Sequence, residues 1–118
     1  MIIFYEYPKC STCQRAKAEL KTLVDDFKSI DIKENPPQAE LFKKWMTESS
    51  FSMKNFFNTS GNSYRQLGLK NKIDDLSIDQ AASLLSEDGM LAKRPILVKD
   101  GQVLQIGARK PYKDLFKD

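Results

Sequence analysis

The hydrophobic positions of the chain change their spacing along the sequence, and each change marks an expected element. The run from Ile2 to Tyr5 is β-branched and aromatic, which predicts a buried strand. From Ser11 the apolar positions recur at helical spacing, which predicts a helix. The positions on its apolar face are Ala16, Leu20, Leu23, Val24 and Phe27. A second strand is expected around Ile30 and Ile32, and because a helix joins the two strands, they should pair in parallel with a right-handed crossover.

The middle of the chain alternates between short helical patterns and turn residues. The Asn-Pro-Pro sequence at 35–37 should end the second strand, because proline cannot donate to a sheet ladder. After it, Phe42, Trp45 and Met46 fall on one helical face, so we expect them in the core. Further helical segments are expected at 52–57, 64–69 and 77–89.

The last part of the chain predicts a hairpin. Asp100-Gly101 stands between two apolar runs, and this dipeptide favours a tight turn between antiparallel strands at 95–99 and 102–106. A short helix is expected at 108–116, with its last apolar residues packing inward. The element order βαβ, helical insert, ββα predicts an α/β fold with a four-stranded mixed sheet and flanking helices.

Composition narrows the class of protein. The 118 residues, 41% of them hydrophobic, suit one domain with a hydrophobic core. The net charge is +3, with 19 basic and 16 acidic residues interspersed, so the composition has no nucleic-acid footprint. No apolar run is long enough to cross a membrane, and the first residues do not resemble a signal peptide. We therefore expect a cytoplasmic monomer that contacts neither nucleic acid nor membrane.

The candidate chemistry lies in two cysteines, Cys10 and Cys13, between the first strand and the first helix. Strand, Cys-x-x-Cys loop and helix in this order are typical of thioredoxin-type redox proteins. A zinc site would need two more soft ligands, and the chain has no histidine and no third cysteine. A structural disulfide that closes so short a loop would remove little entropy from the unfolded chain. Two inert, buried cysteines remain an alternative to redox chemistry.

The start of the helix should control the reactivity of Cys10. Ser11 as N-cap, with Gln14 three residues later, fits a capping box. Cys10 then stands just before the first turn, where unpaired N–H groups and the positive end of the helix dipole favour a thiolate. Lys9 and Arg15 add positive charge, and such surroundings lower a cysteine pKa from about 8.5 to roughly 3.5–7.5. Cys10 is the expected nucleophile, and the second cysteine, more sheltered inside the first turn, is the expected resolving thiol.

Three sequence blocks together resemble one known family. They are the Cys10-Ser11-Thr12-Cys13 loop, Phe56-Phe57-Asn58-Thr59-Ser60-Gly61 with Tyr64-Arg65-Gln66-Leu67-Gly68-Leu69, and Lys93-Arg94-Pro95-Ile96. With the element order, they make the chain similar to the ArsC/Spx family, which includes glutaredoxin-dependent arsenate reductases and the transcription regulator Spx. The resemblance implies one thioredoxin-like domain, 1–118, with its core in 1–33 and 93–118 and a helical insertion at 34–92.

The resemblance also implies the residues of a site. Pro95 would be a cis-proline that faces the cysteine loop, and Arg94 would lie close to Cys10 and stabilise its thiolate or bind an anion. Substrate contacts would come from Ser11, Thr12, Asn58 and Pro95. The alternative for Arg94 is a surface ion pair with a carboxylate such as Asp88. The reductant would be glutathione, a glutaredoxin or a thioredoxin, and neither a bound cofactor nor a metal is expected.

The sequence departs from the arsenate-reducing members at two positions. Those enzymes surround the oxyanion with a group of arginines. Here Asn58 stands in place of the arginine in the insert, and Arg109 lies two or three residues beyond the position of the later arginine. Arsenate is therefore expected to be a poor substrate, because asparagine cannot replace the paired donors of a guanidinium.

Three function classes stay open at this point. The first is a thiol–disulfide oxidoreductase of the arsenate-reductase-like kind. The second is an Spx-like regulator that binds RNA polymerase and senses oxidation through the same cysteine pair. The third is a scaffold that retains the fold without its chemistry, since fold does not imply function.

Overall fold

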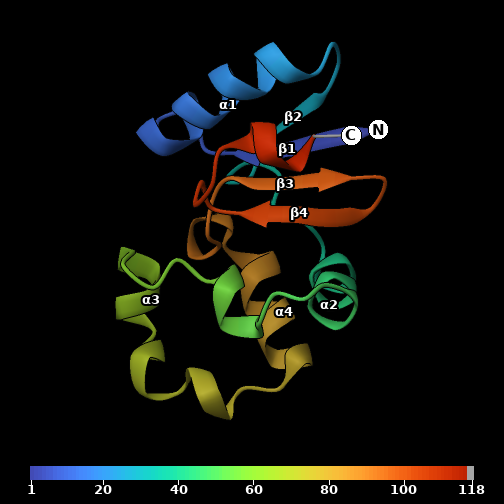
Figure 1. Ribbon diagram of the computed structural model, residues 1–118. Helices are drawn as coiled ribbons and strands as arrows, with labels where there is room; N and C mark the ends of the chain where they lie inside the picture. The colour runs from blue at the N-terminus through green and yellow to red at the C-terminus, as the bar shows by residue number, and fades with distance from the viewer. Residues whose placement is uncertain (117–118) are drawn as a thin grey trace. The chain divides into compact units, whose positions relative to one another are not determined.

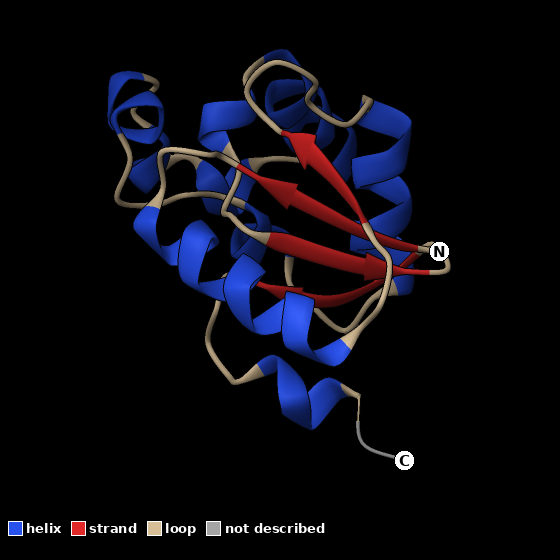
Figure 2. Ribbon diagram, turned by 90° about the horizontal axis from the view of Figure 1, so that it is seen from above, coloured by secondary structure: helices blue, strands red, loops and turns tan. Residues whose placement is uncertain are grey.

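The computed structural model describes residues 1–116 and contains a four-stranded mixed sheet. Its strands are β1 (Ile2–Glu6), β2 (Lys28–Asp31), β3 (Ile96–Lys99) and β4 (Gln102–Ile106), in the spatial order β2-β1-β3-β4. β1 pairs in parallel with β2 and antiparallel with β3, which is itself antiparallel to β4. Figure 2 shows the four strands side by side. The α/β class, the mixed sheet and the parallel pairing of the first two strands are confirmed.

The chain divides into two compact units. The first unit comprises Met1–Asp31 and the chain from Arg94 onward, and it holds the sheet, helix α1 (Ser11–Leu23) and the 3₁₀ turn η5 (Tyr112–Leu115). The second unit, Ile32–Lys93, is helical. Its elements are α2 (Ala39–Glu48), η1 (Met53–Phe56), α3 (Asn62–Gln66), η2 (Leu69–Asn71), η3 (Ile73–Asp75), α4 (Ile78–Glu87) and η4 (Gly89–Leu91). Figure 1 labels the strands and the α-helices.

In the first unit, α1 and η5 cover the sheet together. Phe4 of β1, Leu20 of α1, Leu97 of β3 and Tyr112 of η5 are fully buried in one cluster, which Ala16 completes. Ala16 and Leu20 are four residues apart, so they lie on the same face of the helix. Burial of one leucine or phenylalanine side chain contributes about 1.5–3 kcal/mol. The cluster therefore holds α1 against β1, and the loop that carries the cysteines joins these two elements directly.

The hairpin between β3 and β4 has the predicted turn. Asp100 has a φ of 52° and Gly101 a φ of 83°. A two-residue turn of the hairpin type needs positive φ at both positions, which aspartate and glycine adopt most readily. The ammonium group of Met1 adds an exposed ion pair to Asp100 at 2.7 Å. The hairpin expected from the sequence is confirmed, with strands at Ile96–Lys99 and Gln102–Ile106.

The second unit has an aromatic core. Phe42, Trp45 and Met46 of α2 are buried, as their helical spacing predicted. The Phe42 ring meets Trp45 edge-on at 5.5 Å between centroids and Phe56 at 6.4 Å. Such edge-to-face pairs add about 0.5–1.5 kcal/mol beyond the burial of their area. The helix predicted after the Asn-Pro-Pro sequence is confirmed, and it packs along α4.

Two boundaries in the first part of the chain differ from the expected ones. Helix α1 ends at Leu23, so Val24 and Phe27 pack against the core of the first unit from outside the helix. The second strand stops at Asp31, and Ile32 is buried beyond its end. Val24 and Phe27 fit the helical spacing of α1, and Ile32 follows directly after β2, but all three lie outside these elements. Their side chains are still packed inward, because loop residues also bury side chains.

The prediction of a helix at 108–116 was wrong for most of that segment. Within this segment only Tyr112–Leu115 is helical, as a 3₁₀ turn. Pro111 comes directly before it, and a proline disfavours the helical conformation of the residue that precedes it. The segment 108–111 is therefore without helix. Leu115 and Phe116 do pack against the core of the first unit, as expected.

Candidate functional site at the start of helix α1

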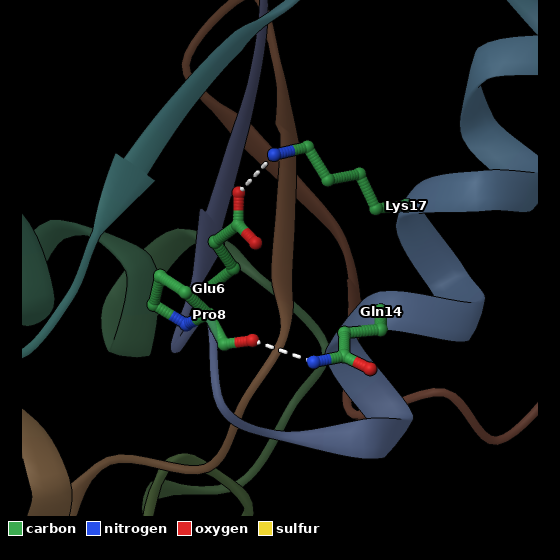
Figure 3. A network of polar contacts seen from close by, with 4 residues as sticks. All are labelled: Glu6, Pro8, Gln14 and Lys17. Carbon is green, nitrogen blue, oxygen red and sulfur yellow. Dashed lines mark hydrogen bonds and ion pairs between the residues drawn. The ribbon is translucent and has the colours of Figure 1, made fainter.

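The loop between β1 and α1 is held by hydrogen bonds from both sides. The backbone N–H of Cys10 donates to the carbonyl of Tyr7 at 2.9 Å. The side-chain amide of Gln14, in the first turn of α1, donates to the carbonyl of Pro8 at 2.8 Å (Figure 3). One turn further, Lys17 Nζ lies 2.8 Å from the buried carboxylate of Glu6, the last residue of β1. The strand end, the loop and the helix start therefore form one braced segment.

The N-cap of α1 is Cys10, and the predicted capping box of Ser11 and Gln14 was wrong. The helix begins at Ser11, one residue earlier than expected, and the backbone N–H of Cys13 donates to Cys10 Sγ at 3.4 Å. The side-chain amide of Gln14 donates to the carbonyl of Pro8 and does not cap the helix. Ser11 is exposed. The sulfur of Cys10 thus occupies the position of a capping oxygen, where the positive end of the helix favours negative charge.

The surroundings of Cys10 lower the pKa of its thiol. Partial burial raises it, but the opposing contributions together are larger. They come from the backbone N–H and the thiol of Cys13, the positive charge of Arg94 and the backbone N–H of Thr12. The cation that lowers the pKa of Cys10 is Arg94. Lys9 and Arg15, which the sequence suggested for this role, are not among the causes of the shift.

The surroundings of Cys13 have the opposite effect. Its side chain is fully buried, and burial raises the pKa of its thiol to about 12. This value includes smaller contributions: a backbone hydrogen bond of Tyr7 and the charge of Arg94 lower the pKa, whereas the hydrogen bond with Cys10 and the negative charge of Cys10 raise it. Both cysteines are free thiols. Cys10 is therefore the thiol that ionises first, and Cys13 holds its proton.

Arg94 and Pro95 adjoin the cysteine loop within the first unit. The Arg94–Pro95 peptide bond is cis, as the resemblance implied. The Arg94 guanidinium carbon lies 5.5 Å from the centroid of the Tyr7 ring, which is a cation–π distance. The carbonyl of Pro95 accepts the backbone N–H of Gly107 at 2.8 Å, and Gly107 has a φ of 73°, which favours glycine. The turn after β4 therefore holds the segment that carries Arg94.

The remaining predicted site residue, Asn58, belongs to the second unit. Its backbone N–H donates to the carbonyl of Leu91 at 2.8 Å, and its side-chain oxygen accepts the hydroxyl of Ser60 at 3.3 Å. These bonds organise the loop in which it stands. Within the first unit, the structure brings together Cys10, Cys13, Arg94 and the backbone of Thr12.

Sequence reasoning missed three residues around the cysteines. Tyr7 lies under Arg94, and Gly107 anchors Pro95. Tyr112 is fully buried, its hydroxyl has no hydrogen-bond partner among residues 1–116, and its pKa is raised by burial and by the charge of Cys13. Only the position of Tyr7 just before the Cys-x-x-Cys loop was a usable sequence signal, because the other two residues reach the site from the far end of the chain.

Replacing Arg94 by alanine is expected to raise the pKa of Cys10 and leave the fold intact. The variant loses a cation that favours the thiolate. At a pH below the pKa of Cys10 in both the wild type and the variant, alkylation by iodoacetamide should be slower in the variant by a factor of about 3 to 10, since one pKa unit is a tenfold change in thiolate fraction. A pH profile of the alkylation rate measures the shift. Lys9→Ala is the matched control, and equal shifts in both variants would refute a specific role for Arg94.

The mixed sheet and the Cys-x-x-Cys sequence at the N-terminus of α1 define a thioredoxin-like thiol protein. The chain belongs to the ArsC family, whose family model matches residues 5–111.

Proteins of this family need no bound cofactor. Across residues 1–116, no group of three or more His, Cys, Asp or Glu side chains is placed to hold a metal ion. No helix in the same described range is long and apolar enough to span a membrane.

The similar proteins fall into reductase-like, regulatory and uncharacterised groups. The uncharacterized protein YusI of Bacillus subtilis is 43% identical over 109 residues, which are 92% of each chain. The global transcriptional regulator Spx of Lactiplantibacillus plantarum is 30% identical over 107 residues, or 91% of this chain and 79% of the regulator. The crystal structure of a possible arsenate reductase from Streptococcus mutans has 61% identity and a TM-score of 0.94, and covers 98% of this chain and 97% of that one.

Proposed function

We propose that the protein is a thiol–disulfide oxidoreductase in which Cys10 is the nucleophile and Cys13 the resolving thiol. The observation that carries the proposal is the opposite pKa shift of two thiols in one helical turn, lowered for the partly exposed Cys10 and raised for the buried Cys13. Because the thiolate is the attacking species, Cys10 reacts first while Cys13 remains protonated.

The proposed reaction consists of two thiol–disulfide exchanges. The Cys10 thiolate attacks one sulfur of a disulfide substrate, forms a mixed disulfide and expels the other half as a thiolate. Cys13 then attacks Cys10 Sγ while its proton passes to the departing second half, which leaves as a thiol, and a Cys10–Cys13 disulfide remains. The substrate has gained two electrons, and glutathione, a glutaredoxin or a thioredoxin restores the protein dithiol by the reverse exchange.

The residues around the cysteines take supporting roles in this proposal. Arg94 stabilises the thiolate of Cys10 and offers paired donors to an anionic group on the substrate. We assign the substrate contacts to Ser11, Thr12 and Pro95, which are next to the catalytic groups in the chain. The substrate contact that the resemblance implies for Asn58 stays a prediction.

The disulfide is the product that tests the proposed function. Mild peroxide treatment of the reduced protein should yield a species lighter by two hydrogens, because Cys13 is close enough to Cys10 for its backbone N–H to donate to Cys10 Sγ. Mass spectrometry of the intact protein and of the peptide that contains both cysteines measures it, and dithiothreitol should reverse the change. A sulfinic acid on Cys10 with Cys13 still free would contradict the resolving role.

Arsenate is expected to be reduced poorly. The family's arsenate-reducing members use an arginine where this chain has Asn58, and an amide lacks the charge and the paired donors of a guanidinium. A coupled assay with glutaredoxin and glutathione measures turnover, with Asn58→Arg as the companion variant that should increase it. Arsenate turnover by the unmodified protein on the order of 10 per second, an ordinary enzymatic rate, would show that the missing arginine is dispensable.

A second candidate function is regulation of transcription. It is favoured by the 30% identity to the global transcriptional regulator Spx, which extends over 91% of this chain. In this case the Cys10–Cys13 pair would sense oxidation, and RNA polymerase would be the partner. Affinity capture with the reduced and the oxidised protein separates the two candidates: retention of polymerase subunits by one redox form favours the regulator, and their absence favours the oxidoreductase.

A further inference from the structure

Tyr7 connects three groups of the candidate site, all of them within the first unit. Its backbone carbonyl accepts the N–H of Cys10 at 2.9 Å, and a backbone hydrogen bond of Tyr7 also acts on Cys13. The centroid of its ring lies 5.5 Å from the guanidinium carbon of Arg94. The main chain of Tyr7 is therefore fixed to the cysteine loop, and its side chain meets the cation that lowers the pKa of Cys10.

The position of the Arg94 guanidinium depends on more than the backbone that carries it. The carbonyl of Pro95 accepts the N–H of Gly107 at 2.8 Å, which holds this part of the main chain. An arginine side chain has several rotatable bonds, so its charge can lie at different distances from a neighbouring group even when the backbone is fixed. A contact at the guanidinium itself is needed to hold the charge in one place, and the Tyr7 ring makes such a contact.

The ring of Tyr7 is suited to this task. A guanidinium over an aromatic ring is attracted by the negative face of the π-system, and its planar shape stacks on the ring in a way that an ammonium group does not. Tyr7 and Arg94 are both half-buried, so their contact is partly shielded from water, which strengthens the attraction. Because the attraction comes from the ring, it does not require the hydroxyl of Tyr7.

We propose that Tyr7 is a positioning residue that holds the Arg94 guanidinium beside the sulfur of Cys10. The inference rests on the proposed function, because it gives Tyr7 the task of keeping the nucleophile of that reaction ionised. The groups that favour the negative charge of Cys10 are the backbone N–H groups of Thr12 and Cys13, the Cys13 thiol and Arg94. Of these groups, Arg94 comes from outside the cysteine loop and therefore needs a separate support.

The first test separates the aromatic face of Tyr7 from the bulk of its side chain. Tyr7→Leu removes the face and keeps an apolar side chain, whereas Tyr7→Phe, the matched control, keeps the face and removes only the hydroxyl. The pKa of Cys10 should rise in Tyr7→Leu. At a pH below the pKa of Cys10 in every variant, alkylation by iodoacetamide should be about threefold slower in Tyr7→Leu and within about 1.5-fold of the wild type in Tyr7→Phe. Equal rates in Tyr7→Leu and the wild type, or equal slowing in the two variants, would overturn the proposal.

A double variant shows whether Tyr7 acts through Arg94. Arg94→Ala alone already removes the cation, so the addition of Tyr7→Leu should slow alkylation by no more than about a further 1.5-fold. A contribution of Tyr7 that is independent of Arg94 would instead multiply the two effects, because it would persist without the guanidinium. Thermal unfolding of each variant identifies the rates that belong to folded protein. A double variant slower than Arg94→Ala by the full factor measured for Tyr7→Leu would contradict the positioning role.

A measurement on the wild-type protein keeps the proposal testable if Tyr7→Leu does not fold. NMR should show nuclear Overhauser contacts between the ring protons of Tyr7 and the side chain of Arg94, because the guanidinium lies over the ring. The Hδ protons of Arg94 should also have upfield ring-current shifts. Tyr7→Phe should retain both signals. Their absence from the wild type would refute the contact on which the proposal depends.

These readouts also separate the role of Tyr7 from the proposed function. Alkylation and NMR need no disulfide substrate, so they test the position of Arg94 whatever reaction Cys10 performs. Failure of the wild type to exchange with hydroxyethyl disulfide would count against the proposed function alone. Normal exchange by the wild type, together with unchanged alkylation in Tyr7→Leu, would count against the role of Tyr7 alone.

Discussion

Replacing Cys10 by serine is expected to abolish disulfide exchange, whereas replacing Cys13 by serine is expected to stop only its second step. A serine hydroxyl stays protonated where the Cys10 thiol ionises, so the loss should exceed about a thousandfold, as for removal of other enzymatic nucleophiles. In Cys13→Ser the nucleophile and its cap position remain, because the N–H that donates to Cys10 Sγ belongs to the backbone. This variant should therefore accumulate a mixed disulfide.

The two serine variants control for each other, because each removes one sulfur atom from the same helical turn. Stopped-flow measurements of thiol release give the rate of the first exchange, and mass spectrometry identifies the adduct. One substrate half should remain attached to Cys10 in Cys13→Ser and to no residue in Cys10→Ser. An adduct on Cys13 in the Cys10→Ser protein, formed at the wild-type rate, would reverse the assigned roles of the two cysteines.

Replacing Gly89 by alanine is expected to destabilise the second unit more than any other glycine substitution in it. A Cβ atom at Gly89 would stand 1.8 Å from the carbonyl oxygen of Ile32 and 2.7 Å from its carbonyl carbon. Both are backbone atoms, so no rotation of a side chain relieves the overlap. Insertion of a methyl group into a packed core costs about 1–3 kcal/mol and occasionally more. We expect a loss of about 3 kcal/mol for this substitution.

Gly68→Ala is the control for this prediction. Gly68 has a φ of 65°, and a Cβ atom there would meet nothing within 4 Å, so its cost is conformational alone, about 1–2 kcal/mol. Urea denaturation followed by the fluorescence of Trp45, which is buried in the same unit, measures both variants. A smaller loss for Gly89→Ala than for Gly68→Ala would contradict the close approach of the two backbone segments.

Local sequence patterns determined most of the elements. The β-branched run of β1, the buried face of α2 and the Asp100-Gly101 turn were all predictable, because side-chain spacing and the conformational freedom of single residues act within a few positions. The Cys-x-x-Cys sequence at the start of a helix was predictable for the same reason. The family followed from three short blocks, and the match to the ArsC family confirmed it.

The properties of the site depend on residues that are distant in the chain. Arg94, more than 80 positions after Cys10, lowers the pKa of that thiol, whereas the neighbouring Lys9, which the sequence favoured, is not among the causes. Full burial, which raises the pKa of Cys13 to about 12, is a consequence of the packing around it. Charge and burial act through space, so sequence spacing does not reveal them.

The conformation of segment 108–111 was also not predictable from sequence spacing. Its sequence suggested a helix, but Pro111 precedes the only helical turn of this segment and the hydrogen bond between Glu19 and the Tyr112 backbone ties its end to α1, so 108–111 is not helical. That course brings Arg109 and Lys110 into the lining of the same surface groove as Arg15. Only the tertiary structure decided this juxtaposition, because each residue alone is an ordinary exposed cation, and the groove exists where two elements remote in the chain lie together.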